Sequence, residues 1–390
     1  MKYDFDKIID RRNSNSAKWD AVEMLFGSKD VLPMWVADMD FDAPAPVIEA
    51  LTKRAENGIY GYLGRPDSYY EAFINWVKRR HGWTIDRRWL TFSPGVVCGI
   101  SVAILALSQP GDEVITQPPA YYPFYRLVKN NGRQLVYNPL RLVDGQYRMD
   151  FDDLKKKAGP RTRMMILCNP HNPVGRVWEK DDLRQVGEFC LENNIVLISD
   201  EIHSDLIHKG HKHVPTASIS DEIAQNTIVC MAPSKTFNLA GLKSSAIIIP
   251  NKGLRLSFNL MLDSIGIRMD NTFGAVALES AYQYGEDWLE QLLEYLAGNI
   301  KFATEFLDQN VPGITAMDLE GTYLLWLDCR ELGLSDKALK ELMDKKAKVG
   351  LDEGPMFGPG GEGFQRLNLA CPRATLEDGL TRIERAVKSM

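Results

Sequence analysis

Short apolar runs alternate with amphipathic stretches from about residue 46 to residue 285. The apolar runs are rich in β-favouring residues and occupy positions 113–116, 164–168, 195–199, 227–231 and 245–250. Among them lie stretches with helical patterns, at 46–57, 68–80, 95–108, 121–131 and 181–193. Short apolar runs separated by helices are typical of a mostly parallel sheet with helices on its faces. The pattern therefore predicts an α/β fold.

The pattern changes after residue 285. Residues 286–310 place their apolar side chains on one face of a long helix. A mixed series follows, with a strand at 322–328, a helix at 335–348, a glycine-rich loop, a strand at 364–370 and a final helix.

This change predicts three parts of the chain. We expect residues 46–285 to form a large α/β domain and residues 286–390 a smaller α+β domain. Residues 1–45 are expected to be an irregular N-terminal arm that joins the small domain. The length of 390 residues is enough for two or three domains.

Composition and charge exclude several classes of partner. The chain is 45% hydrophobic and 25% charged, with a net charge of −6. That balance gives no reason to expect nucleic acid or an anionic membrane as a partner. The chain has no uncharged apolar run long enough to span a bilayer, and its first residues do not form a signal peptide. Its six cysteines are widely spaced, so we expect reduced thiols in a cytoplasmic protein.

Three polar side chains follow three of the predicted strands. Asn172 comes after the run at 164–168, Asp200 directly after 195–199, and Lys235 after 227–231. In an open parallel sheet, ligands bind just beyond the carboxyl ends of the strands. If these strands are neighbours, the three side chains face one crevice.

An amine, an acid and an amide match the needs of pyridoxal 5′-phosphate (PLP). The Lys235 amine can form an imine with the cofactor aldehyde. The Asp200 carboxylate can keep the pyridine nitrogen protonated, so that the ring accepts electrons. The Asn172 amide can donate to the ring hydroxyl.

Other segments supply the remaining contacts that such a cofactor needs. The turn Gly95-Val96-Val97 opens an apolar helix whose first N–H groups can bind the phosphate, and Ser234 and Lys243 could add a hydroxyl and a charge. Tyr121 is the candidate to cover the ring face. Arg366 is the candidate to bind the substrate carboxylate, with Arg373 in reserve.

The segments NPHNPVG, SDEIH, APSKTFNLAGL and RLNLACPR together resemble the fold-type I PLP enzymes of the class I/II aminotransferase superfamily. Within it, WVADMDF, GYLG, PPAYYPFY, DEIHSD and SKTFN are similar to the MalY/PatB branch of cystathionine β-lyases. The resemblance covers essentially the whole chain, in the order of the family.

The resemblance carries roles over by position. It implies that Lys235 is the Schiff-base lysine, and that Tyr62 reaches the phosphate of the other subunit, which predicts a homodimer with shared active sites. Asp38, like Tyr62 and Arg366, is expected near the substrate. His203 stands where aminotransferases often carry tyrosine, and Ala232 and Lys243 also depart from the wider superfamily.

The implied reaction is β-elimination from S-substituted cysteines, which gives a thiol, pyruvate and ammonia. An aminotransferase on the same scaffold is the nearest alternative, and a non-catalytic PLP-binding regulatory protein is an alternative of another class. A further hypothesis is that Tyr121 or Tyr122 protonates or positions the leaving sulfur.

Each candidate also has a simpler structural interpretation. Lys235 and Lys243 could lie on the surface, Asp200 could cap a helix, Asn172 could serve a turn, and the tyrosines could be packing residues. Arg366 could pair with a structural carboxylate. The four histidines between 203 and 213 are interpreted as part of an exposed loop and not as a metal site. The glycine-rich run 358–363 precedes a strand, so it is not a dinucleotide fingerprint.

Overall fold

The computed structural model describes residues 1–267 and 269–390. Among these residues, one sheet has seven strands in the order β2-β10-β9-β8-β7-β3-β4. Every neighbouring pair is parallel except those made by β10, which runs antiparallel to both β2 and β9. The strands are β2 (Leu90–Ser93), β3 (Glu113–Thr116), β4 (Gln134–Tyr137), β7 (Thr162–Cys168), β8 (Val196–Asp200), β9 (Thr227–Met231) and β10 (Ser245–Ile248).

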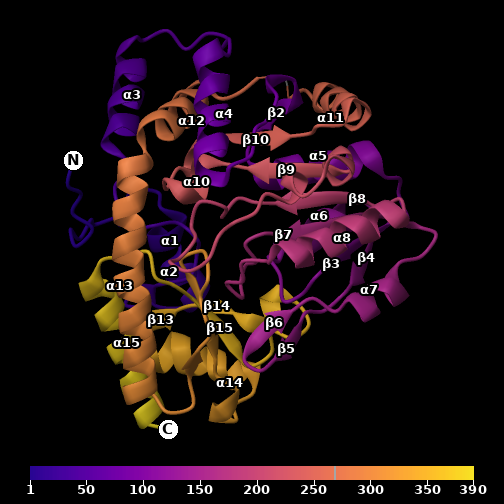
Figure 1. The fold of residues 1–390 in the computed structure, drawn as a ribbon. Coiled ribbons are helices and arrows are strands. Elements are labelled where there is room, and N and C mark those ends of the chain that lie inside the picture. Colours follow the sequence, from indigo (N-terminus) through magenta and orange to yellow (C-terminus); the bar gives the residue numbers. More distant parts are fainter. Residues whose placement is uncertain (268) are drawn as a thin grey trace.

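Helices cover both faces of this sheet (Figure 1). Side chains alternate along each strand, so Ile166 and Ile198 pack toward one face and Met165 and Leu197 toward the other. The first face is covered by α5 (Val96–Leu107), α6 (Pro123–Asn130) and α11 (Lys252–Ser264). The second is covered by α4 (Asp67–His81), α8 (Lys180–Glu192) and α12 (Thr272–Tyr284). Because the strands are buried on both faces, their sequences are nearly continuous apolar runs. The predicted α/β fold class is confirmed.

A second, antiparallel sheet has the order β11-β12-β15-β14. The long helix α13 (Glu286–Asn310) runs down one side of the molecule, from the region of α12 to this sheet (Figure 1). The remaining elements of this part are β11 (Thr315–Ala316), β12 (Leu324–Asp328), α14 (Asp336–Glu341), β14 (Asp352–Glu353), β15 (Phe364–Asn368) and α15 (Arg373–Lys388).

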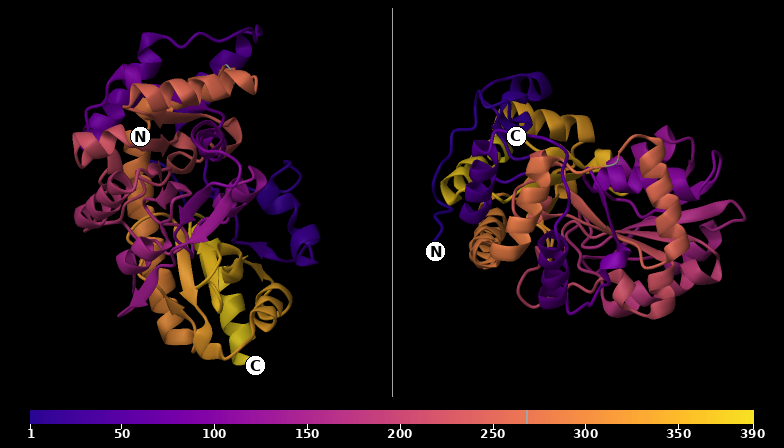
Figure 2. Two further views of the ribbon diagram at one scale, coloured as in Figure 1. Left: turned by 90° about the vertical axis from the view of Figure 1, so that its right-hand side faces the viewer. Right: turned by 90° about the horizontal axis from the view of Figure 1, so that it is seen from above.

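The N-terminal segment lies beside the C-terminal part of the chain, as both views of Figure 2 show. Strand β1 (Leu32–Pro33) pairs in parallel with β13 (Val349–Gly350). The expectation of an irregular arm is wrong at α1 (Ala17–Asp20) and α2 (Val22–Phe26). These helices have four and five residues, too few to show a helical period in the sequence.

Elsewhere the predicted elements match to within a few residues, with one exception. The helix expected at 335–348 divides into α14 and a π-helical segment, η5 (Leu342–Ala347). The helices α11 and α12 and the strands β2 and β4 have no predicted range. Several short elements also have none: η1 (Arg87–Trp89), β5 (Arg141–Val143), β6 (Gln146–Arg148), α7 (Phe151–Lys157), η2 (Thr216–Ser218), α9 (Asp221–Gln225), α10 (Pro233–Thr236), η3 (Ala240–Leu242), η4 (Arg330–Leu332) and η6 (Gly354–Phe357). The helix α3 spans Ala45–Glu56. None of the helices in the described ranges combines the length and the apolar character that crossing a membrane requires.

Candidate active site

The sheet topology gathers the candidate residues at one edge. The carboxyl ends of the parallel strands lie there, and so does the start of β10, because Ser245 pairs with Ser93 at the end of β2. Residues that follow β2, β3, β7, β8 and β9, or precede β10, therefore share this edge. They are Gly95, Tyr121, Asn172, Asp200, Lys235 and Lys243.

Asp200 is a buried carboxyl group at the end of β8. It is 3% exposed, and it accepts a hydrogen bond of 3.1 Å from the backbone N–H of Ile202. Burial raises the pKa of Asp200 to about 7, although the charge of Lys235 acts in the opposite direction. The next element along the chain is η2, so the interpretation of Asp200 as a helix cap is wrong.

Lys235 lies in the single turn of α10, which follows β9. Its Nζ donates a hydrogen bond of 2.6 Å to the carbonyl oxygen of Ala37. Burial lowers the pKa of Lys235 to about 8; nearby Arg366 also lowers it, whereas Asp38 and Asp200 raise it. The amine therefore lies within the fields of four charged groups, Arg366, Asp38, Asp200 and Lys243, and it is not a solvated surface group.

Arg366 reaches the same site from β15 of the second sheet. Its guanidinium donates to Oδ1 of Asn172 at 2.9 Å and to the carbonyl oxygen of Trp35 at 3.2 Å. It also pairs with Asp352, its cross-strand neighbour on β14. Asp352 is therefore the structural carboxylate with which Arg366 could be expected to pair. Nε of Arg366 is buried and lacks a partner among the described residues. The described residues therefore leave one donor of this guanidinium unsatisfied.

Arg373 lies outside this site. Its guanidinium donates to Oδ1 of Asn299 at 2.9 Å and lies over the ring of Phe302, on α13. It therefore joins α13 to α15.

Tyr121 and Tyr122 lie side by side, with ring centroids 5.6 Å apart. Burial raises the pKa of both phenols. The charges of Arg366 and Asp200 act on Tyr121, and those of Asp352 and Arg366 act on Tyr122. Both hydroxyls therefore stay protonated near neutral pH, within range of the site.

His203 is buried at the same edge. Its ring lies 6.2 Å from the ring of Tyr323, centroid to centroid. Burial, and then the charges of Lys235 and Arg366, hold its pKa well below the usual value. The imidazole is therefore neutral, and its Nδ1 lacks a partner among the described residues.

The Gly95 turn leaves space at the start of α5. Gly95 has φ = 95°, which glycine adopts readily, and a Cβ placed there would meet no atom within 4 Å. The first N–H groups of a helix have no partner within the helix. Lys243 is exposed, but its charge acts on both Lys235 and Cys98, so it lies near the first turn of α5. Ser234 is half-buried in α10.

Two candidates stand apart from this group. Tyr62 is 94% exposed, in the segment between α3 and α4, and so is not enclosed in the site of its own chain. Asp38 is paired with Arg11 at 2.7 Å, although its charge still acts on Lys235.

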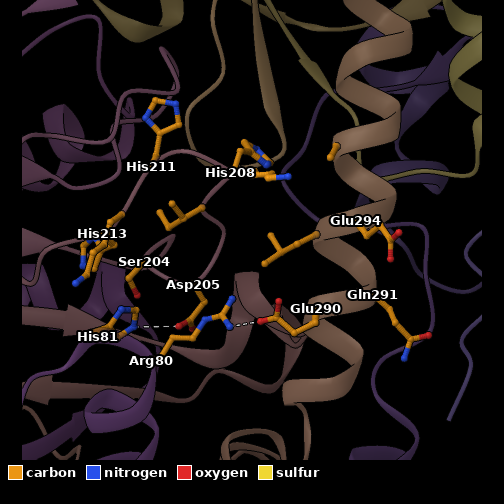
Figure 3. Close-up of a pocket in the computed structure, with 15 residues that line it drawn as sticks. Arg80, His81, Ser204, Asp205, His208, His211, His213, Glu290, Gln291 and Glu294 are labelled. Atoms are coloured by element: carbon orange, nitrogen blue, oxygen red, sulfur yellow. Dashed lines mark hydrogen bonds and ion pairs between the residues drawn. The ribbon is translucent and has the colours of Figure 1, made fainter.

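A buried carboxylate supports the turn of Lys235 from behind, which was not predicted from the sequence. The buried carboxylate of Asp205 accepts hydrogen bonds from Thr236 Oγ1 at 2.8 Å, Trp76 Nε1 at 2.9 Å and His81 Nε2 at 3.0 Å. Figure 3 shows His81 directed at Asp205 in the wall of a cleft. Because Thr236 is adjacent to Lys235, this carboxylate ties the turn that carries the amine to α4.

A similar contact lies behind Asp200. The neighbouring Glu201 accepts hydrogen bonds from His213 Nε2 at 2.8 Å and from the backbone N–H of Thr216 at 2.9 Å. The interpretation of the histidine segment as wholly exposed is therefore wrong. His213 is buried, and its pairing with Glu201 satisfies the imidazole there. His208 contacts the carbonyl oxygen of Thr322 at 2.6 Å.

These residues fit PLP. Asp200 is buried and has one protein donor in the described part of the chain, so a protonated ring nitrogen would satisfy it. Lys235 supplies an amine of lowered pKa, and the Gly95 turn provides open space at a helix start. Arg366 keeps a buried donor without a partner.

Comparison with known proteins agrees with this geometry. The family model described as aminotransferase class I and II matches residues 29–383. Cystathionine beta-lyase PatB of Bacillus subtilis (strain 168) is 48% identical over 384 residues, covering 98% of this chain and 99% of that protein. Protein MalY of Escherichia coli (strain K12) is 31% identical over 391 residues, covering 100% of both. The structure of cystalysin from Treponema denticola, which contains a pyridoxal 5′-phosphate cofactor, has a TM-score of 0.97 at 39% identity over 100% of both chains.

The Asp205 support generates a prediction about Thr236. Replacing Thr236 with valine removes the hydroxyl donor and keeps a similar side-chain shape, so the turn that carries Lys235 should lose its fixed position. We expect affinity for PLP, measured by equilibrium titration of the apoprotein, to fall by about tenfold, the value of one hydrogen bond to a charged group. Thr236→Ser keeps the hydroxyl donor, so its affinity for PLP should equal that of the unaltered protein. Equal affinities for the valine and serine variants would show that the hydroxyl has no positioning role.

Proposed function

The chain belongs to the class I and II aminotransferase family, and from this premise we propose that it is a PLP-dependent lyase that cleaves the carbon–sulfur bond of S-substituted cysteines. The observation that carries the proposal is the position of Lys235 within the charge fields of both Asp200 and Arg366. The similarity to PatB, named a cystathionine beta-lyase, supports this reaction for the site. Cystathionine and related thioethers of cysteine are the proposed substrates.

PLP supplies, when bound, an electron-accepting ring that stabilises negative charge at the α-carbon of an amino acid. Lys235 is the residue proposed to hold it covalently, and the same Nζ is the general base that removes the α-proton. Asp200 keeps a proton on the ring nitrogen, because a buried carboxyl group with one backbone donor stabilises a cation beside it. Ser234, Lys243 and the N–H groups that follow Gly95 are proposed to bind the phosphate.

Other residues orient the ring and the substrate. Arg366 binds the substrate α-carboxylate through the donor that has no protein partner. Asn172 accepts a hydrogen bond from Arg366 and would donate its amide N–H to the ring hydroxyl, so it would link the position of the substrate to that of the cofactor. His203 is proposed to contact the ring as a neutral imidazole, and Asp38 lies at the edge of the substrate space.

Transamination on the same scaffold is the nearest alternative. It requires the α-proton to return at the cofactor carbon, whereas elimination requires a leaving group on Cβ. The identity of 48% with a cystathionine beta-lyase favours elimination. The shifted pKa values of Lys235 and Asp200, whose charges act on each other at one edge of the sheet, favour an enzyme over a non-catalytic binding protein.

We also propose a cytoplasmic homodimer in which Tyr62 completes the site of the partner. The exposure of Tyr62 supports the dimer, and the six free thiols support a reducing compartment. The division into an arm, a large domain and a small domain is proposed because the pattern of the chain changes near residues 45 and 285. The pairing of β1 with β13 supports the place of the arm.

Replacement of Lys235 tests the proposed function directly. Lys235→Ala should lower the release of pyruvate and thiol from cystathionine by at least about 10²–10⁴-fold, since it removes the general base. Lys252→Ala, which alters an exposed lysine at the start of α11, is the matched control. Transfer of the amino group to a 2-oxo acid, with no thiol released by the unaltered enzyme, would establish the transaminase instead.

The adjacent phenols generate a second prediction. Because burial keeps both hydroxyls protonated, either could donate a proton to the leaving sulfur. We expect Tyr121→Phe or Tyr122→Phe to lower kcat for thiol release by about 10²-fold, the lower range for general acid catalysis, with little change in KM. Unchanged elimination rates in both variants would dispose of this role.

The lowered pKa of Lys235 predicts the pH dependence of cofactor capture by the apoprotein. Only the neutral amine attacks an aldehyde, so the rate should increase as pH rises through about 8. Between pH 7 and pH 9 we expect a rise of about tenfold, measured by stopped-flow absorbance. Nα-acetyl-lysine, with an ordinary pKa of about 10.4, is the reference amine. A midpoint close to that of the reference would contradict the effect of burial.

A further inference from the structure

A second hollow lies outside the candidate active site, where the N-terminal segment meets the end of η5 and the last turns of α15. Its volume is about 690 Å³. Six of its ten lining residues are lysine or arginine, and one is acidic, Asp30. The six cations are Arg12, Lys29, Lys346, Lys348, Arg382 and Arg385. Because the whole chain has a net charge of −6, this concentration is local and does not follow from composition.

The cleft drawn in Figure 3 provides a comparison of similar size, about 650 Å³. Its lining mixes the two signs of charge, with Arg80, Lys209 and Lys212 beside Asp205, Glu290 and Glu294. Arg80 is already paired with Glu290 there (Figure 3). Of these two hollows, only the basic one favours one sign of charge.

In the described part of the chain, two of the six cations of the basic hollow have no ion pair, and the other four are in ion pairs that are not buried: Arg12 with Asp10, Lys29 with Glu23, Lys348 with Asp30 and Arg382 with Asp378. Lys346 and Arg385 have no acidic group within 4.0 Å in the described part of the chain, and both are exposed. Lys348 contacts Asp30 at 3.2 Å, an exposed pair of the kind that contributes little to stability. An anion would therefore meet these cations without breaking a buried ion pair.

The hollow has a wall that the fold holds in place. Arg382 donates hydrogen bonds to the carbonyl oxygens of Asp30 at 3.1 Å and Lys348 at 3.3 Å, and it pairs with Asp378 at 2.8 Å. It thereby joins α15 to the N-terminal segment and to the end of η5. Val31 and Ala347 are buried beneath these contacts.

We propose that this hollow binds a multiply charged anion of the polyphosphate class, either free or as part of a phosphorylated small molecule. The cations come from four separate segments, so a ligand must carry several charges to engage more than one of them. A volume of this size accepts a molecule larger than a single phosphate. The proposal is independent of the reaction at Lys235.

Isothermal titration calorimetry of the PLP-loaded protein with inorganic tripolyphosphate tests the proposed anion site. We expect saturable binding of one equivalent, which weakens as salt increases. The double variant Lys346→Glu, Arg385→Glu should weaken binding by at least about tenfold, because it reverses two charges that face the ligand. Lys155→Glu with Lys156→Glu on α7 is the matched control, since both residues are exposed and the change in net charge is identical. The control should stay within about twofold of the original affinity.

Two further measurements distinguish binding in this hollow from binding at the cofactor site and from misfolding of a variant. The absorption spectrum of the bound cofactor should not change during titration, which separates this hollow from the phosphate site of the cofactor. Circular dichroism checks that the variants fold, and Lys346→Gln alone replaces the double variant if that protein does not fold. Equal weakening in the α7 control, absence of saturation at low salt, or binding of inorganic phosphate as tight as that of tripolyphosphate would each overturn the proposal.

Discussion

The candidate site depends on the burial of two opposite charges at the edge of one sheet. Asp200 and Lys235 each lose contact with water, and burial shifts each pKa toward the neutral form, upward for the acid and downward for the amine. Their mutual attraction opposes both shifts. The lowered pKa of Lys235 makes its neutral amine available near neutral pH, which general base catalysis requires.

Holding these charges apart from water requires support from behind. Asp205 and Glu201 provide it, because each buried carboxylate accepts hydrogen bonds from several partners on other elements. Hydrogen bonds from several elements to one buried carboxylate restrict its position. Thr236, which donates to Asp205, is adjacent to Lys235, and Glu201 is adjacent to Asp200, so these contacts hold the backbone of the amine and of the acid in place.

The sequence predicted the fold class and the gathering of Asn172, Asp200 and Lys235 because a parallel sheet brings the ends of its strands together. It did not predict that β10 runs antiparallel, since an apolar run has the same pattern in either direction. Asp352 was missed because its pairing with Arg366 arises from cross-strand register in the second sheet. Asp205 was missed because its partners are far away in the sequence: Thr236 lies 31 positions away and His81 124 positions away. The burial of His213 depends on the same kind of distant pairing.

The segment from Trp35 to Ala37 meets the two principal cations of the site through main-chain oxygens, one for Arg366 and one for Lys235. Every amino acid supplies such an oxygen. Sequence drift along this segment can therefore change the shape and polarity of the space around a substrate without removing either acceptor. The fold thus holds both cations by acceptors that do not depend on which side chains stand at positions 35 and 37.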